Sequence, residues 1–481
     1  MLRRVAVSAF GLSCTACLPT APFADEPRVR EAMPIHVPAE EQRTGDVERG
    51  YHTLVNGDYI GCGIPRSLYD AVIGSQQPTP EGLKLAGRDA DSSNLPYAYN
   101  GFVSRRGNRI VSANCLTCHA TVFDGQLRVG LGESNPDMTR NLLSQVGLAR
   151  LLIQDPNDLV EFDLWAQRTQ TVAPAILAPI TGVQTADNIA PILAAHRDPQ
   201  TLAWSQEPLL EFTPAAPVPI DTPPMWRTKK KNALYYTGAG RGDHGTWLMI
   251  ASALCVDDVD DARAIREKFA DVRAFMNSVE PLPWPAHAPA IDDDKAARGA
   301  QVFVNTCARC HGTYGATDDD DTYPNLIIPT EVVGTDPLLA KPAGTFISDM
   351  FHGWFERSFF AETARLEPEN GYYAPPLDGI WATAPFLHNA SVPTLEGVID
   401  SSKRPAFWQR QKDANDQGVF DFDAVGWLVD ERTADETDNA GDNKKFIYDT
   451  RLPGYGNEGH TFGDGLRDEE RADLLEYLKT L

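Results

Sequence analysis

The chain has 481 residues and a formal net charge of −24 at pH 7. This length allows two or three compact units, and the strong negative charge excludes nucleic acid as a natural partner. The charge favours a partner with a basic docking face, although it also serves solubility.

The chain begins with an expected export signal over residues 1–24. A basic stretch ending at Arg4 precedes an apolar run, residues 5–16, that is too short to span a bilayer. Two processing sites for this signal are possible. A lipid-anchored Cys17, as in a lipoprotein, is favoured, and the alternative is simple cleavage near Ala24. A periplasmic or extracellular protein is therefore expected, with membrane contact only through the lipid anchor.

An N-terminal domain is expected over residues 25–280. Its residues 115–119 read Cys-Leu-Thr-Cys-His, with short strands expected at residues 109–111 and 126–129. Helical character is expected between residues 138 and 166. These stretches predict a unit with insertions around the first motif.

The end of this domain is marked by a helix and a stiff linker. Apolar residues recur at helical spacing over residues 261–279, from Ile265 to Phe275. The proline-rich residues 281–291 follow and form the best domain boundary.

A C-terminal domain is expected over residues 292–481. A helix over residues 292–311 ends in a second motif, Cys-Ala-Arg-Cys-His at residues 307–311, and Gly299 allows close packing on it. The last helix is expected over residues 468–481, with Asp468 as candidate N-cap. A helix ending in the motif and a final helix crossing it form the plan of a cytochrome c domain.

Both motifs spell C-x-x-C-H, the attachment signature of c-type haem. Two thiols at this spacing reach the two vinyl groups of one porphyrin, and the histidine is carried beneath the ring to ligate the iron. The alternatives are a zinc site, which needs four converging ligands, a thioredoxin-like redox pair, and chance. Two copies favour two covalently bound haem c groups, held by Cys115, Cys118, His119, Cys307, Cys310 and His311.

Two cysteines and two acidic runs have no part in these motifs. Cys62 and Cys255 either form a disulfide in an oxidising compartment or remain two buried free thiols. Residues 318–321 and 435–442 are expected to be solvated loops, with calcium binding as the less favoured alternative because neither run has EF-hand spacing.

Residues 113–119, 130–132, 385–395, 459–463 and 476–479 carry a family resemblance. They resemble the di-haem rubber oxygenase-like cytochromes, relatives of the bacterial di-haem cytochrome c peroxidases and of the tryptophylquinone-forming di-haem enzymes. The similarity runs from about residue 51 to the end. It implies a mainly α fold with two cytochrome c-like haem lobes joined by a Pro-rich linker, with long loops and few short strands. It also implies a reactive N-terminal haem and a C-terminal haem that relays electrons. The chain looks shorter than the rubber-cleaving enzymes, so a pocket for the polymer is not assumed and the resemblance does not assign rubber as its substrate.

The sixth iron ligands decide between chemistry and electron transfer. The resemblance assigns His460 to the second haem, the alternative being a surface loop histidine, and gives His388 a supporting place near that haem. His352 and Met350 have side chains that can ligate iron, but the aromatic stretch around them equally indicates packing in the core.

For the first haem, His244 is the leading distal candidate and His52 the next, while an open position is at least as well supported. Four tryptophans are candidates for an electron relay, although core packing is their default interpretation: Trp165, Trp226, Trp247 and Trp284.

Two functions follow. The first is an oxidoreductase, of oxygenase or peroxidase type, that uses a small-molecule oxidant at the N-terminal haem. The second is a pure electron-transfer cytochrome with both haems six-coordinate. Neither catalytic residues nor substrate can be assigned from the sequence.

Overall fold

The computed structural model describes residues 33–74, 81–141, 146–211, 217–341, 348–413 and 418–481. The expected signal over residues 1–24 and its Cys17 lie outside the described residues. None of the helices in the described ranges is both long and apolar enough to cross a bilayer.

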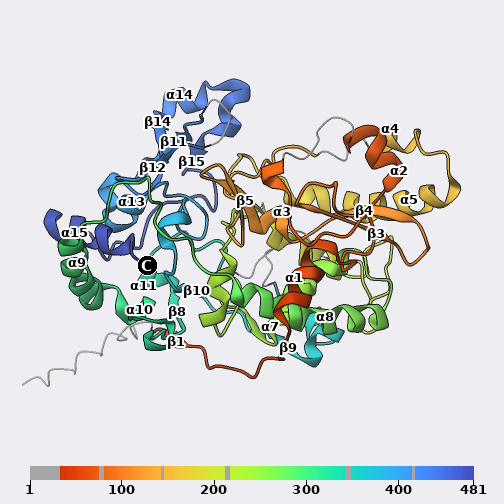
Figure 1. The fold of residues 1–481 in the computed structure, drawn as a ribbon, viewed down its shortest axis with the longest axis horizontal. Coiled ribbons are helices and arrows are strands. Elements are labelled where there is room, and N and C mark those ends of the chain that lie inside the picture. The colour runs from red at the N-terminus through yellow and green to blue at the C-terminus, as the bar shows by residue number, and fades with distance from the viewer. Residues whose placement is uncertain (1–32, 75–80, 142–145, 212–216, 342–347, 414–417) are drawn as a thin grey trace, which may run out of the picture.

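The helices and strands are short and numerous (Figure 1). The α-helices are α1 (Val47–Asn56), α2 (Arg66–Tyr69), α3 (Leu116–His119), α4 (Val146–Arg150), α5 (Pro156–Val172), α6 (Ile189–Ala195), α7 (His244–Leu248), α8 (Val259–Ser278), α9 (Asp293–Thr306), α10 (Ala308–His311), α11 (Thr330–Val333), α12 (Asp349–Phe355), α13 (Leu395–Ile399), α14 (Ala434–Asp438) and α15 (Asp468–Leu478). The strands are β1 (Ile35–His36), β2 (Ile64–Pro65), β3 (Tyr99–Val103), β4 (Arg109–Ala113), β5 (Ala120–Phe123), β6 (Gln126–Val129), β7 (Gly240–Gly242), β8 (Leu326–Pro329), β9 (Ala364–Leu366), β10 (Gly371–Tyr373), β11 (Phe407–Arg410), β12 (Phe420–Asp421), β13 (Gly426–Trp427), β14 (Val429–Glu431) and β15 (Tyr448–Asp449).

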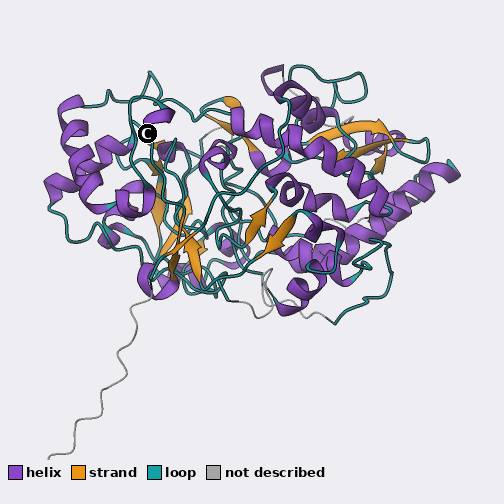
Figure 2. Cartoon of the chain, turned by 90° about the horizontal axis from the view of Figure 1, so that it is seen from below, coloured by secondary structure: helices purple, strands orange, loops and turns teal. Residues whose placement is uncertain are grey.

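The prediction of a mainly α fold with few short strands is wrong. The structure is 39% helical and 14% strand, and its strands pair antiparallel in small sheets such as β2-β4-β3, β1-β8-β10 and β14-β11-β15. Local turn chemistry explains part of this difference. Asp124 and Gly125, with φ of 53° and 70°, join β5 to β6 in the two-residue Asp-Gly turn that favours a hairpin. Loops lie between the helices and these sheets (Figure 2).

Several predicted elements are confirmed. β4 and β6 lie where short strands were expected on either side of the first motif, and α8 covers the expected helix that ends near residue 279. The Asp258 carboxylate caps α8 by accepting a hydrogen bond from the Asp261 N–H. The apolar stripe of α8, which includes Ile265 and Phe269, is buried as helical spacing requires.

The predicted crossing of two helices beside the second motif is also confirmed. α9 and α15 lie side by side at the left of Figure 1. A Cβ on Gly299 would come within 1.9 Å of the Asp473 carbonyl oxygen, so only glycine permits this approach. The cap of α15 is Arg467 rather than the predicted Asp468, which is the first helical residue.

Two large hydrophobic cores surround the two motifs. The first core includes Leu116 of the first motif and packs α1, α7 and α8 together. The second includes Phe303 and Leu474, from α9 and α15. The predicted domain boundary at the proline-rich residues 281–291 stays a prediction. Residues from both sides of this boundary contribute to the first core.

The shared part is the stretch from α12 to β9. These residues follow the second motif in sequence, yet their apolar side chains belong to the first core, and β9 lies with α7 and α8 in Figure 1. The side chains are Phe351, Trp354, Phe355, Phe359, Phe360, Ala364 and Leu366. The chain therefore returns from the second motif to complete the core around the first.

The structure joins Cys62 and Cys255 in a disulfide across 193 residues. This selects the bridged alternative over two free thiols. Both cysteines are buried next to the first core.

Candidate cofactor cavities

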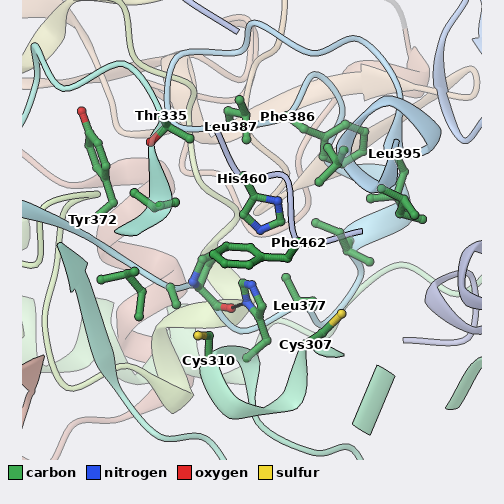
Figure 3. Close-up of a pocket in the computed structure, with 18 of the residues that line it drawn as sticks. Cys307, Cys310, Thr335, Tyr372, Leu377, Phe386, Leu387, Leu395, His460 and Phe462 are labelled. Atoms are coloured by element: carbon green, nitrogen blue, oxygen red, sulfur yellow. Dashed lines mark hydrogen bonds between the residues drawn. The ribbon is translucent and has the colours of Figure 1, made fainter. Parts of the chain in front are cut away.

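The second C-x-x-C-H motif opens into a cavity. α9 ends at Thr306 with Cys307 as its C-cap, and the single turn of α10 carries Cys310 and His311 to the wall of a cavity. Gly312, with φ of 80°, ends this turn. Figure 3 shows Cys307 and Cys310 on one side of this space, with Thr335, Leu387 and His460 across from them. The apolar lining and the paired thiols suit a large, flat, largely apolar group.

His311 is held in one orientation by the backbone. Its Nδ1 lies 2.8 Å from the Pro375 carbonyl oxygen, and a histidine that donates from Nδ1 keeps Nε2 for a metal ion. Burial lowers the pKa of His311, so the neutral imidazole that a metal needs is favoured.

His460 lines the same cavity from a loop that is firmly hydrogen-bonded. Its N–H donates to the Val333 carbonyl (2.6 Å), while the Arg404 guanidinium donates to the carbonyls of Gly459 (2.6 Å) and His460 (3.1 Å). His460 itself has φ of 45°, a conformation that is rare for a residue with a side chain. Such strain is maintained where the surrounding structure fixes the residue for a purpose.

The spacing of the two histidines fits two ligands of one metal ion. The ring centres of His311 and His460 are 6.2 Å apart. Imidazoles that ligate one ion from opposite sides have ring centres about 6 Å apart, because each nitrogen–metal bond is about 2 Å long. Burial lowers the pKa of His460 to about 4, and its buried Nδ1 has no hydrogen-bond partner among the described residues.

His388 lies in the wall of this cavity and not opposite His311. Its ring stacks on Tyr372 at 4.1 Å between ring centres, and its carbonyl accepts a hydrogen bond from the Asp221 N–H (2.8 Å). Burial lowers the pKa of His388 to about 3. This position agrees with a supporting role for His388 beside the cavity.

The first motif lines a separate cavity. It lies on α3, between β4 and β5, where the Asn114 side chain accepts a hydrogen bond from the Leu116 N–H (2.9 Å). The Cys115 N–H donates to the Tyr59 hydroxyl (3.1 Å). Because the two motifs face different cavities, their cysteines do not converge on a single four-ligand zinc site.

A proline carbonyl faces each motif histidine. Burial lowers the pKa of His119 to about 4, while the Pro223 carbonyl raises it, as the Pro375 carbonyl does for His311. At His119 the contact is looser, because its buried Nδ1 has no hydrogen-bond partner at normal distance in the part of the chain that the structure describes. The sequence contained a feature that could have identified these two carbonyl groups. Each proline is the first of a Pro-Pro pair, residues 223–224 and 375–376.

No second histidine lines the first cavity among the residues that the structure describes. His244 is buried at the start of α7 outside the lining, and the exposed His52 lies 3.4 Å from Asp89. Two methionines, Met225 and Met276, do contribute to the wall. The two histidine candidates for this haem, His244 and His52, are therefore outside the described lining, and the open position stays a prediction.

The other ligand and relay candidates are dispersed. His352 lies 3.7 Å from Glu356 on the exposed side of α12, and Met350 packs on the first core. Of the four candidate tryptophans, Trp247 lines the first cavity and stacks on Phe355 at 4.6 Å between ring centres. The others, Trp165, Trp226 and Trp284, pack in apolar clusters.

Polar groups that the sequence analysis missed line the first cavity. Asp187 and Tyr235 contribute to its wall, and burial raises the pKa of Asp187 to about 7. A carboxyl group with such a pKa exchanges protons near neutral pH, as an acid–base group requires. Neither residue belongs to a recognisable sequence motif, so only the folded structure identifies them.

Asp221 and Tyr236 line both cavities. The Tyr236 hydroxyl donates to the Asp221 carboxylate at 3.4 Å, and burial raises the pKa of Asp221 to about 8. The two cavities are thus separated by one layer of chain, and residues 221–236 form a shared wall.

The acidic runs make local contacts. Residues 318–320 form a short 3₁₀ turn, Asp321 pairs with Lys230, and Asp438 pairs with Arg451. Within the described ranges, no three His, Cys, Asp or Glu side chains are grouped to hold a metal ion.

Comparison with known proteins identifies one segment of the second cavity. Residues 371–409 match the family described as RoxA-like, cytochrome c-like. This segment supplies Pro375 and His388 to the cavity wall. This region of the chain is therefore cytochrome c-like, which supports covalently bound haem c and a redox role. The wider relation to the di-haem peroxidases stays a prediction.

Two proteins of Sinorhizobium fredii are similar over longer stretches. The uncharacterized protein y4iJ is 29% identical over 294 residues, which cover 48% of this chain and 47% of the relative. The uncharacterized protein y4iM is 27% identical over 306 residues, which cover 56% and 66%. The alignments span less than two thirds of the length of these curated relatives.

Proposed function

We propose that the chain is an exported redox protein with two haem c groups, in which the first cavity is the reactive site and the second relays electrons. The observation that carries this proposal is the pair of C-x-x-C-H motifs, each at the wall of its own large apolar cavity. The cytochrome c-like segment at residues 371–409 supports the haem c assignment.

The two sites differ in their available ligands. In the second cavity, His311 and His460 face each other across 6.2 Å and would hold the iron on both sides. In the first, His119 has no histidine counterpart in the described lining. A histidine-ligated haem iron with an open sixth position binds oxygen or peroxide. This asymmetry favours a division of labour between the cavities.

The residues of the first cavity suit proton transfer to a bound oxidant. Asp187 holds a proton near neutral pH because burial disfavours its carboxylate. The hydroxyls of Tyr235 and Tyr236 add hydrogen-bond donors to a wall that is mostly apolar. These groups can supply protons, which an oxygenase or peroxidase needs.

The alternative function is pure electron transfer with both haems six-coordinate. Met225 and Met276 favour it, because they line the first cavity and a thioether can serve as sixth ligand to haem iron. Carbon monoxide distinguishes the two functions: a reactive first haem takes up one equivalent in the ferrous state, whereas an electron carrier takes up none.

Mass spectrometry tests the cofactor content directly. Protein made with a c-type maturation system should carry two covalent haems, and the double change Cys115→Ala and Cys118→Ala should leave one, on residues 307–311. The replacement of Cys307 and Cys310 is the matched experiment and should leave one haem on residues 115–119. A parent protein with fewer than two haems would contradict the proposal.

An exported location follows from the expected signal and agrees with the Cys62–Cys255 disulfide. The net charge of −24 suits a redox partner with a basic docking face. The mass of the mature N-terminus tests the route: an acylated Cys17 supports a lipid anchor, and a start near residue 25 supports simple cleavage.

A further inference from the structure

A cationic segment lies in the wall that the two cavities share. Residues 227–231 read Arg-Thr-Lys-Lys-Lys and follow closely on Pro223 and Pro224 of the first cavity. Most of the segment is a 3₁₀ turn, Met225–Lys230. Its four cations differ sharply in their partners.

Two of these cations are paired with protein carboxylates. Lys229 lies 3.4 Å from Glu280, an exposed residue. Lys230 lies 2.5 Å from both Asp321 and Asp378, in a largely buried cluster. Both lysines therefore have their charge balanced within the protein.

The other two cations face the cavities. Arg227 is 8% exposed and lines the second cavity. Its guanidinium donates to the Asp378 carbonyl and to the Thr383 hydroxyl, each at 3.2 Å. Lys231 lines the first cavity, with its ammonium 5.4 Å from the ring centre of Tyr373. Within the described ranges, neither residue forms an ion pair with a carboxylate.

A buried cation without an ion-paired carboxylate is costly, although the Asp378 and Asp221 carboxyl groups act favourably on the charge of Arg227. Desolvation disfavours its charged form, and burial lowers the pKa of Arg227 and brings that of Lys231 to about 8. An anionic group placed in the cavity would remove this cost and would gain charge-assisted hydrogen bonds. The charged groups of haem c other than the iron are the two propionate carboxylates at one edge of the ring.

We propose that the segment 227–231 is a two-sided anchor for propionates, in which Arg227 binds a propionate of the second haem and Lys231 one of the first. This inference rests on the proposed function, since it needs both haems. It assigns each cation to one cavity, and it directs the propionate edges of both haems toward the wall that holds Asp221 and Tyr236.

The reduction equilibrium of each haem tests the assignment. A cation beside a propionate stabilises the reduced iron, because reduction adds one negative charge nearby. Arg227→Gln should therefore shift the second haem about tenfold toward the oxidised form at a fixed potential, or about 59 mV, and leave the first haem unchanged. Lys231→Gln should shift the first haem alone. Spectroelectrochemical titration, with electron paramagnetic resonance to follow each ferric haem, measures both.

Lys229→Gln is the matched control, since it removes a cation of the same segment that pairs with Glu280 outside the cavities. It should shift neither haem. Equal shifts of both haems in all three variants, or no shift in Arg227→Gln and Lys231→Gln, would overturn the inference. A parent protein without two haems would instead defeat the proposed function, so the two failures are distinct.

Conservative variants keep the test decisive where a glutamine variant does not assemble. Arg227→Lys and Lys231→Arg retain the charge but change the donor geometry. The propionate bending band in the resonance Raman spectrum should then move for the second haem and for the first haem, respectively. Bands that stay in place in both variants would overturn the inference.

Discussion

His460 is held at its place by backbone contacts that do not depend on its ring. Val333 and Arg404 bind its main chain, so removal of the side chain should leave the loop in place. We expect His460→Ala to open the second iron: ferrous protein should bind one more equivalent of carbon monoxide than the parent, and a low-spin ferric signal should become high-spin. Carbon monoxide difference spectra and electron paramagnetic resonance check this.

The exposed His352 offers a control of the same residue type. His352→Ala should leave carbon monoxide uptake at the parent value. Uptake that is the same in His460→Ala and the parent would show that His460 is not an iron ligand.

His388 should make stability depend on pH. Its folded pKa, about 3, lies below the unfolded value of about 6.5. Below pH 6.5 the unfolded chain therefore takes up a proton that the folded protein does not, and stability falls as the pH decreases toward 3. His388→Phe retains a ring next to Tyr372 and removes this proton, so its stability should fall less steeply, by up to about 1.4 kcal/mol per pH unit. Denaturant unfolding between pH 6 and 4 measures the difference, and parallel curves would contradict it.

At the residue scale, the residues that belong to a sequence motif could be predicted. The residues whose role depends only on their place in the fold were missed. The cysteines of both motifs and His460 lie at cavity walls, and His311 and His460 face each other. Asp187, Arg227 and Lys231 escaped notice because a buried titratable group is recognised only by what surrounds it. His244 lies outside the lining of the first cavity, and spacing alone does not show which cavity a side chain faces.

At the level of elements, the contact of α9 with α15 depends on Gly299. Gly299→Ala should destabilise the protein by about 1–3 kcal/mol, because the added methyl group meets the Asp473 carbonyl. Gly353 in α12 is the matched control, since a Cβ there meets no atom of the described residues within 4 Å. Gly353→Ala should be neutral or stabilise by about 0.4–1 kcal/mol. Thermal or denaturant unfolding compares the two, and equal effects would contradict the close packing.

Long amphipathic helices were predictable, whereas short strands largely were not. α8 and α9 repeat apolar residues often enough for their period to be evident. Strands such as β12 and β15 are two residues long, and so short a stretch has no periodicity of its own. Their pairing depends on segments distant in sequence, as when β1 pairs with β8, and so the mainly α prediction failed.

At the scale of the whole molecule, the Cys62–Cys255 disulfide ties the start of the chain to the segment before α8. The bridge reduces the conformational entropy of the unfolded chain. The double change Cys62→Ser and Cys255→Ser should therefore lower the free energy of unfolding by about 2–5 kcal/mol. Unfolding of the double variant beside the parent measures this. The same loss after mild reduction of the parent would support the cause, and an unchanged stability would contradict it.

The return of the stretch from α12 to β9 to the first core also fixes an order of events during synthesis. A chain emerging from its N-terminus exposes residues 115–119 first and residues 307–311 later, while Phe351 and Leu366 follow both. The first core is therefore still incomplete when the second motif has already emerged. Haem attachment to Cys115 and Cys118 at this stage would thus take place before the first core is complete. The two thiols would remain accessible to the attachment machinery until the stretch from α12 to β9 packs onto the core.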